Sequence, residues 1–109
     1  MTAIMIELTK ETFEPEVLQA TDTILVDFYS DSCEPCQELM PKVVALSEKY
    51  GDKMKFMKLN TMKARRVAIG QKVLGLPVIA IYKGGEKVAE LVKEECTEES
   101  IEKMILENS

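Results

Sequence analysis

Cys33 and Cys36, with Glu34 and Pro35 between them, are the residues of this sequence best suited to chemistry. Two cysteines at this spacing can form a disulfide or supply two thiolate ligands to a metal. A zinc site of the usual kind takes four Cys or His ligands, and the chain has no histidine and one further cysteine, Cys96. The pair therefore predicts reversible dithiol–disulfide exchange without a metal. An inter-chain metal site and an inert pair are the alternatives.

A buried strand and a long helix are predicted to position this pair. Residues 24–29 form an apolar run with β-branched and aromatic side chains, typical of a strand covered on both faces. Pro35 suits the first turn of a helix, which apolar residues at helical spacing continue to Tyr50. The free N–H groups and positive partial charge of a helix N-terminus lower the pKa of a thiol. We therefore expect Cys33 to be the exposed attacking thiol and Cys36 to resolve the mixed disulfide.

The other elements are predicted from alternation, helical spacing and turn residues. Strands are expected at 4–8, 54–59, 76–82 and 88–92, and helices at 9–18, 63–71 and 98–105. The order β-α-β-α-β-α-β-β-α predicts an α/β fold with a central mixed sheet of about five strands, flanked by about four helices on its two faces.

Length and charge limit the possible functions. The chain has 109 residues, which predicts one domain over residues 1–109, and a formal net charge of -5. An acidic chain is poorly suited to nucleic acid or anionic membranes, which attract clustered Lys and Arg. No apolar stretch approaches the ~20 residues that span a bilayer, and the N-terminus lacks a targeting pattern. We therefore expect a cytoplasmic protein, in a compartment that keeps thiols reduced.

Several motifs occur in the order and spacing of the thioredoxin family, which the chain resembles from about Glu7 to Glu107. They are Val26-Asp27-Phe28, the Cys-x-Pro-Cys motif, Pro41 within the long helix, Lys58-Leu59-Asn60, Gly75-Leu76-Pro77 and Gly84-Gly85-Glu86. The resemblance implies the thioredoxin fold and a protein disulfide reductase in electron transport and cell redox homeostasis. It implies no bound cofactor.

The resemblance also implies roles for residues around the cysteines. Asp27 would be a buried carboxylate that accepts a proton from Cys36 through water, and its burial should raise its pKa. Lys58 would be the charge partner of Asp27. Pro77 would be a cis-proline facing the disulfide, and Leu76 would offer backbone hydrogen bonds to an extended substrate segment. The alternatives are a water-facing Asp27 and a merely solvated Lys58.

The chain departs from the family pattern around the site. Ser32 and Tyr29 stand where tryptophans are usual, and Glu34 and Lys93 stand where glycines are usual. The charge of Glu34 should disfavour a Cys33 thiolate, while a helix N-terminus favours the carboxylate itself, which leaves the redox poise open. A lysine beside the substrate groove predicts acidic partners. The predicted substrate-contacting residues are Ser32, Glu34, Pro35, Leu76, Pro77 and Lys93.

The implied partners are a thioredoxin reductase, which is a flavoprotein, and proteins that contain disulfides. The site sequence and residues 74–82 resemble thioredoxins of amino-acid-fermenting anaerobic bacteria, which implies glycine reductase components as one target. We expect a monomer. The main alternative is a thioredoxin-fold binding module or scaffold with incidental redox activity, followed by an oxidant or isomerase. We expect Cys96 to be a bystander, with a regulatory thiol as the alternative.

Overall fold

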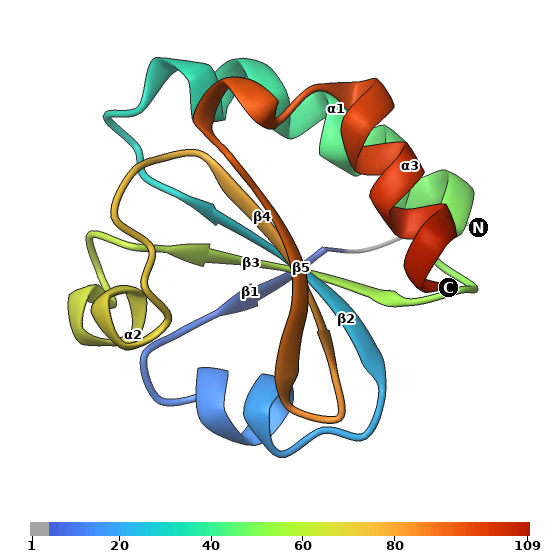
Figure 1. Cartoon of the computed structure of the whole chain (residues 1–109). Helices are drawn as coiled ribbons and strands as arrows, with labels where there is room; N and C mark the ends of the chain where they lie inside the picture. The colour runs from blue at the N-terminus through green and yellow to red at the C-terminus, as the bar shows by residue number, and fades with distance from the viewer. Residues whose placement is uncertain (1–4) are drawn as a thin grey trace.

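The computed structural model describes residues 5–109, and its centre is a mixed sheet of five strands (Figure 1). In spatial order the strands are β1 (Ile6–Leu8), β3 (Lys55–Asn60), β2 (Thr23–Tyr29), β4 (Val78–Lys83) and β5 (Glu86–Val92). The first three are parallel, whereas β4 and β5 are antiparallel to their neighbours. The predicted mixed α/β sheet is therefore confirmed.

Helices cover both faces of this sheet. One face carries α1 (Glu34–Tyr50) and α3 (Glu98–Asn108), and the other carries the π-helix η1 (Glu14–Leu18) and α2 (Arg65–Gly70) (Figure 1). A 3-10 helix, η2 (Lys93–Glu95), connects β5 to α3. Two hydrophobic cores result, one on each face of the sheet.

The predicted order of elements is confirmed. The ends of most elements differ from the prediction by up to three residues, whereas the first helix begins at Glu14, five residues after its expected start. The expected first strand begins at Ile6; of its other expected residues, Ile4 lies outside the described part of the chain. The helix expected at 63–71 is shorter, because residues before it form turns in which the Lys63 N–H donates to the Asn60 carbonyl. The first helix is a π-helix, whose C-terminal Gln19 N–H donates to the Glu14 carbonyl.

Strand β2 carries a side chain to each core in turn. Ile24, Val26 and Phe28 pack with η1 and α2, and Leu25 packs with α1 and α3. Because strand side chains alternate, Asp27 points to the face that α1 covers. The carboxyl end of β2 leads directly into the N-terminus of α1, so this strand places both the cysteine pair and the carboxylate.

The hairpin between β4 and β5 depends on two glycines. Gly84 and Gly85 have φ angles of 57° and 85°, the left-handed region that favours glycine. A side chain at Gly85 would also collide with the backbone carbonyl of Leu18 at the end of η1. This turn therefore fixes the register of β5 and packs against the first helix.

We predict opposite effects for alanine at two glycines. Gly85→Ala should lower the free energy of unfolding by about 1–3 kcal/mol, because it combines a positive φ with a backbone collision. Gly70→Ala is the matched control: no atom lies within 4 Å of the added methyl, and the helix gains up to about 1 kcal/mol. Urea denaturation measures both, and equal stability of the two variants would contradict the role of the turn.

Candidate redox active site

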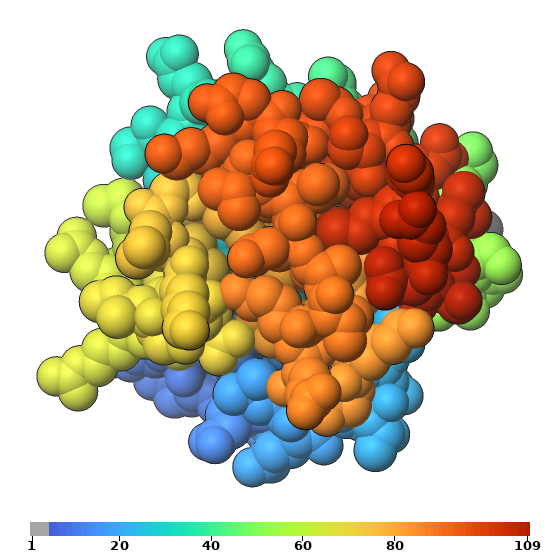
Figure 2. All heavy atoms as spheres, in the orientation of Figure 1, coloured from blue at the N-terminus to red at the C-terminus, as the bar shows by residue number. Residues whose placement is uncertain are grey.

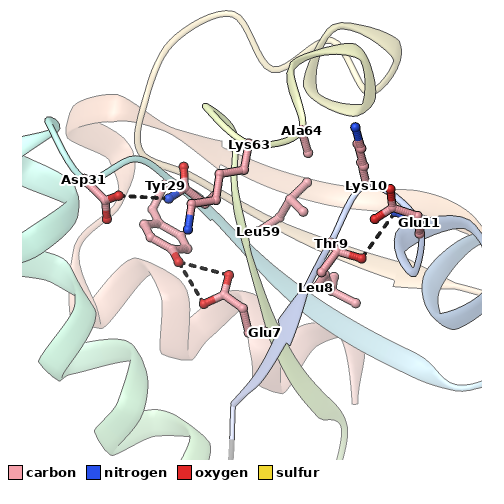
Figure 3. A pocket seen from close by; sticks show the side chains of 11 residues that line it. Glu7, Leu8, Thr9, Lys10, Glu11, Tyr29, Asp31, Leu59, Lys63 and Ala64 are labelled. Atoms are coloured by element: carbon pink, nitrogen blue, oxygen red, sulfur yellow. Dashed lines mark hydrogen bonds between the residues drawn. The ribbon is translucent and has the colours of Figure 1, made fainter.

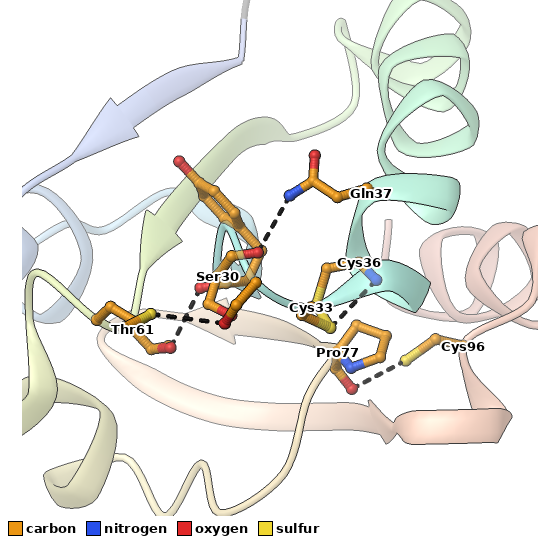
Figure 4. Close-up of a disulfide and its surroundings, with 10 residues drawn as sticks. Ser30, Cys33, Cys36, Gln37, Thr61, Pro77 and Cys96 are labelled. Carbon is orange, nitrogen blue, oxygen red and sulfur yellow. Dashed lines mark hydrogen bonds between the residues drawn. A yellow bond between two sulfur atoms is a disulfide. The ribbon is translucent and has the colours of Figure 1, made fainter.

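Cys33 and Cys36 form a disulfide at the N-terminus of α1, with their Cα atoms 5.2 Å apart (Figure 4). Cys33 is the N-cap residue, and its Sγ accepts a hydrogen bond from the Cys36 N–H at 3.2 Å. The side chain of Cys33 is partly exposed, whereas Cys36 is 1% exposed. A negative charge on the sulfur of Cys33 would therefore be stabilised by a backbone donor and by the positive end of the helix.

The loop between β2 and α1 holds the cysteines in place. The Ser30 carbonyl accepts hydrogen bonds from the Cys33 N–H at 3.3 Å and from the Gln37 side-chain amide at 3.1 Å. The exposed Ser32 hydroxyl lies 3.7 Å from the sulfur of Met62, in the turn after β3. Exposed Glu34 and Pro35 form the first turn of α1 beside the disulfide.

Pro77 lies beside the disulfide, and the Leu76–Pro77 peptide bond is cis, as predicted (Figure 4). Pro77 is buried and Leu76 is half-buried. The Pro77 carbonyl accepts a hydrogen bond from the Lys93 N–H at 2.8 Å and faces the Cys96 thiol at 3.5 Å. The loop before β4 is therefore tied to the end of β5.

Asp27 is buried in the middle of β2, with 1% of its surface exposed. Within residues 5–109, its two carboxylate oxygens accept no hydrogen bond. Burial raises the pKa of Asp27 from 3.8 to about 7; the charge of Lys58 opposes this rise and the charge of Glu7 adds to it. The alternative of a water-facing Asp27 is therefore wrong, and this carboxyl can exchange a proton near neutral pH.

Lys58 occupies the position of β3 that pairs with Asp27 on β2. Its ammonium group lies 3.8 Å from the Glu7 carboxylate and 5.9 Å from the centre of the Tyr29 ring. The Tyr29 hydroxyl donates hydrogen bonds of 2.8 and 2.9 Å to the two Glu7 oxygens. The sequence predicted Lys58 as the charge partner of Asp27. The structure places the two residues opposite each other on the sheet, while the ion pair of Lys58 is with Glu7, which was not predicted and depends on the register between β1 and β3.

Lys93 adopts a left-handed backbone conformation, with a φ angle of 54°. A positive φ angle at Lys93 agrees with the observation that thioredoxins usually have glycine at this position. Its side chain lies against Gly75, so that a side chain at position 75 would collide with it. The aliphatic part of the Lys93 side chain therefore covers the loop that leads into Pro77. Lys93 is exposed to solvent.

An apolar hollow of about 270 Å³ adjoins the loop before Pro77 and was not predicted. Three exposed apolar residues line it: Met62, Ile69 and Leu74 are 50%, 68% and 90% exposed. Arg65, at the start of α2, adds a positive charge to its wall. Figure 2 shows this part of the chain, coloured lime to yellow, projecting at the surface. The signal in the sequence was the presence of Met62, Ile69 and Leu74 in and beside the helix expected at 63–71.

A second pocket of about 360 Å³ lies at the carboxyl ends of the three parallel strands (Figure 3). Its walls combine charged and polar side chains, among them Glu7, Glu11 and Lys63, with apolar ones such as Leu8 and Leu59. The Glu7–Tyr29 hydrogen bonds form part of its wall (Figure 3).

Cys96 is half-buried, and its thiol donates to the Leu91 carbonyl at 3.3 Å. Burial raises its pKa to about 11, so that it is a poor nucleophile at neutral pH.

Within residues 5–109 there is no group of three or more Cys, His, Asp or Glu side chains that could hold a metal ion. Over the same residues, the helices are too short or too polar to cross a membrane.

A disulfide at a helix N-terminus, beside a cis-proline and on the same face of the sheet as a buried carboxylate, is typical of thiol–disulfide exchange proteins. The family model described as Thioredoxin matches residues 4–107. The chain belongs to the thioredoxin family.

Similar proteins agree with this assignment. The chain is 55% identical over 101 residues to a thioredoxin of Acetoanaerobium sticklandii, covering 93% of this chain and 96% of that protein. It is 51% identical over 105 residues to a thioredoxin of Peptoclostridium acidaminophilum, covering 96% of both. The crystal structure of thioredoxin f2 from Chlamydomonas reinhardtii superposes with a TM-score of 0.87 at 27% identity, covering 97% of each chain. The predicted thioredoxin fold is confirmed.

The buried Asp27 predicts a pH-dependent stability. Between its ordinary pKa of 3.8 and the raised value of about 7, the folded state binds more protons than the unfolded state. The free energy of unfolding should therefore fall as pH rises through this window and level off above it. Asp27→Asn removes this loss. At pH 9 the free energy of unfolding of the variant should therefore exceed that of the wild type by at least about 2 kcal/mol.

Urea denaturation from pH 4 to pH 9 measures this effect. The two proteins should differ little near pH 4, the lower end of this window, because Asp27 is then protonated in the folded state and close to half protonated in the unfolded state. The exposed Asp52→Asn is the matched control and should follow the wild-type curve. Parallel curves for wild type and Asp27→Asn across the whole range would contradict the raised pKa.

Proposed function

We propose that this thioredoxin reduces disulfides in other proteins by two-electron exchange at Cys33 and Cys36. The observation that carries the proposal is the disulfide itself, with Cys33 partly exposed at the N-terminus of α1 and Cys36 buried. The fold and the family model over residues 4–107 support one thioredoxin domain over residues 1–109.

In the first step, the thiolate of Cys33 attacks one sulfur of the target disulfide. A bond forms between Cys33 and the target, the target disulfide breaks, and the other target sulfur leaves as a thiolate that takes up a proton. The backbone N–H of Cys36, 3.2 Å from the sulfur of Cys33, supports the attacking charge.

In the second step, Cys36 loses its proton and attacks Cys33. The mixed disulfide breaks, the second target thiolate leaves, and the Cys33–Cys36 bond forms, so that two electrons have passed to the target. Asp27 accepts the proton of Cys36, and its pKa of about 7 suits both uptake and release near neutral pH. Lys58, paired with Asp27 across the sheet, tunes the charge of that carboxyl.

We infer that the target binds as an extended segment along Leu76 and Pro77. Ser32, Glu34 and Pro35 form one border of this surface and Lys93 another. The apolar hollow lined by Met62, Ile69 and Leu74 continues it and would hold an apolar side chain of the target.

The oxidised protein needs a donor of two electrons, and we propose a thioredoxin reductase of the flavoprotein class. The targets are disulfide-containing proteins, with glycine reductase components among them, as the resemblance to anaerobe thioredoxins implies. We propose that the protein acts as a cytoplasmic monomer in electron transport. The half-buried free thiol of Cys96 supports a compartment that keeps thiols reduced.

Two serine variants test the assigned thiol roles. Cys33→Ser should reduce the rate of insulin-disulfide reduction by at least about 100-fold, to background, because the attacking sulfur is lost. Cys36→Ser should accumulate a covalent mixed disulfide with the target, visible by intact mass. Cys96→Ser is the control and should keep the wild-type rate.

Full insulin-disulfide reduction by Cys33→Ser would overturn the assignment of the attacker. Biological activity of a Cys33→Ser, Cys36→Ser double variant would favour the scaffold alternative. The reduction potential of the pair separates the remaining cases, since a reductase requires a strongly reducing value and an oxidant or isomerase a more oxidising one.

Lys93 is predicted to select acidic targets. Lys93→Gln should raise the KM for a disulfide peptide with acidic residues beside its cysteine by about 2–5-fold, the effect of one partly exposed charge pair. The KM for a neutral peptide and the reduction potential should stay unchanged. Lys103→Gln, an exposed position on α3, is the control. An equal change of KM for both peptides would contradict charge recognition.

A further inference from the structure

Glu7, Lys58 and Asp27 form a row across the three parallel strands of the sheet. Glu7 on β1 pairs with Lys58 on β3, and Lys58 pairs with Asp27 on β2. Side chains at paired positions lie on the same face of a sheet. One cation therefore stands between two carboxylates, of which Glu7 is exposed and Asp27 is buried.

Tyr29 fixes the outer end of this row. Its hydroxyl donates to both carboxylate oxygens of Glu7, at 2.8 and 2.9 Å (Figure 3). Its ring lies 5.9 Å below the Lys58 ammonium group, within the range of a cation–π contact. Lys58 thus has two contacts on the outer side, with Glu7 and with Tyr29.

The inner end of the row differs sharply. The Asp27 oxygens accept no hydrogen bond from any group within residues 5–109. The Lys58 ammonium group instead forms its ion pair with Glu7. A buried carboxylate that lacks a direct cation partner is disfavoured in its charged form. The charge state of Asp27 is therefore sensitive to where the Lys58 ammonium group is held.

We propose that Glu7, anchored by Tyr29, is a positioning residue that holds Lys58 away from Asp27 and so keeps the Asp27 carboxyl able to carry a proton at neutral pH. The proposal rests on the proposed function, in which Asp27 takes the proton of Cys36. Glu7 does not touch the reacting sulfurs and acts through Lys58.

The charges around Asp27 agree with this arrangement. Lys58 lowers the pKa of Asp27 and Glu7 raises it, while burial sets the main rise. From the other elements, β4 places the uncharged Ile79 opposite Asp27, and α1 places the cysteine pair on this face. The thiol of Cys96 lies close enough for the Asp27 charge to raise its pKa.

The test is a titration of the Asp27 carboxyl in the oxidised protein, where the cysteine pair does not titrate. Glu7→Gln removes the negative charge and keeps an oxygen that can accept the Tyr29 hydrogen bond. Carboxyl carbon NMR should show the Asp27 midpoint falling by about half a pH unit or more, since Lys58 is released toward Asp27. The resolution rate of a mixed disulfide should shift its pH midpoint in the same direction.

Glu11→Gln is the matched control, because it removes an equal charge from the wall of the same pocket. In this variant the titration midpoint of the Asp27 carboxyl should equal that of the wild type. A second comparison places Glu7→Gln in a Lys58→Met background, where the shift should largely vanish. An equal shift in both backgrounds would show that Glu7 acts on Asp27 directly, and would overturn the role given to Lys58.

Tyr29→Phe provides an independent variant, since it frees Glu7 without removing its charge. The Asp27 midpoint should fall by less than in Glu7→Gln. An unchanged or higher midpoint in Glu7→Gln overturns the proposal. If instead Asp27→Asn leaves the pH profile of resolution unchanged, the proposed role of Asp27 in the reaction fails, while the titration still decides the effect of Glu7.

Discussion

The burial of β2 between two helical layers is the constraint on which the redox site depends. Its apolar side chains fill both cores, which fixes the strand and the helix that follows it. Asp27 is carried into the interior by this packing, because it occupies one position of a strand whose neighbours must be buried. The same strand ends shortly before α1 begins, so the disulfide at the N-terminus of this helix and the buried carboxyl of Asp27 lie on the same face of the sheet.

Two opposed electrostatic effects meet at this junction. The helix N-terminus and the Cys36 N–H favour a negative charge on Cys33, whereas burial disfavours one on Asp27. A sulfur whose negative charge is favoured by a helix N-terminus thus lies on the same face of the sheet as a carboxyl whose pKa is raised to about 7. In the proposed mechanism, a carboxyl with a pKa of about 7 accepts the proton of Cys36 near neutral pH without an external base. Glu34 adds a competing negative charge beside Cys33.

Local sequence patterns predicted most of the fold and the centre of the site. The cysteine pair, the order of elements and the turn at Gly84 all follow from residue types and spacing. The cis bond at Pro77 came only from the family resemblance, since most Leu-Pro bonds are trans. The Glu7–Tyr29 contact joins strands that are distant in sequence, and its geometry depends on a register that no local pattern specifies.

The positive φ of Lys93 links backbone strain to specificity. A non-glycine residue in this region is disfavoured by roughly 1–2 kcal/mol, so glycine is the easier choice on stability alone. Lys93 instead extends a long cation over Gly75, which has no side chain to obstruct it. The two positions are therefore coupled: the lysine requires the glycine opposite, and the strained backbone aims its charge at the loop before Pro77. The proposed recognition of acidic targets gives a reason for a lysine at a position where the backbone favours glycine.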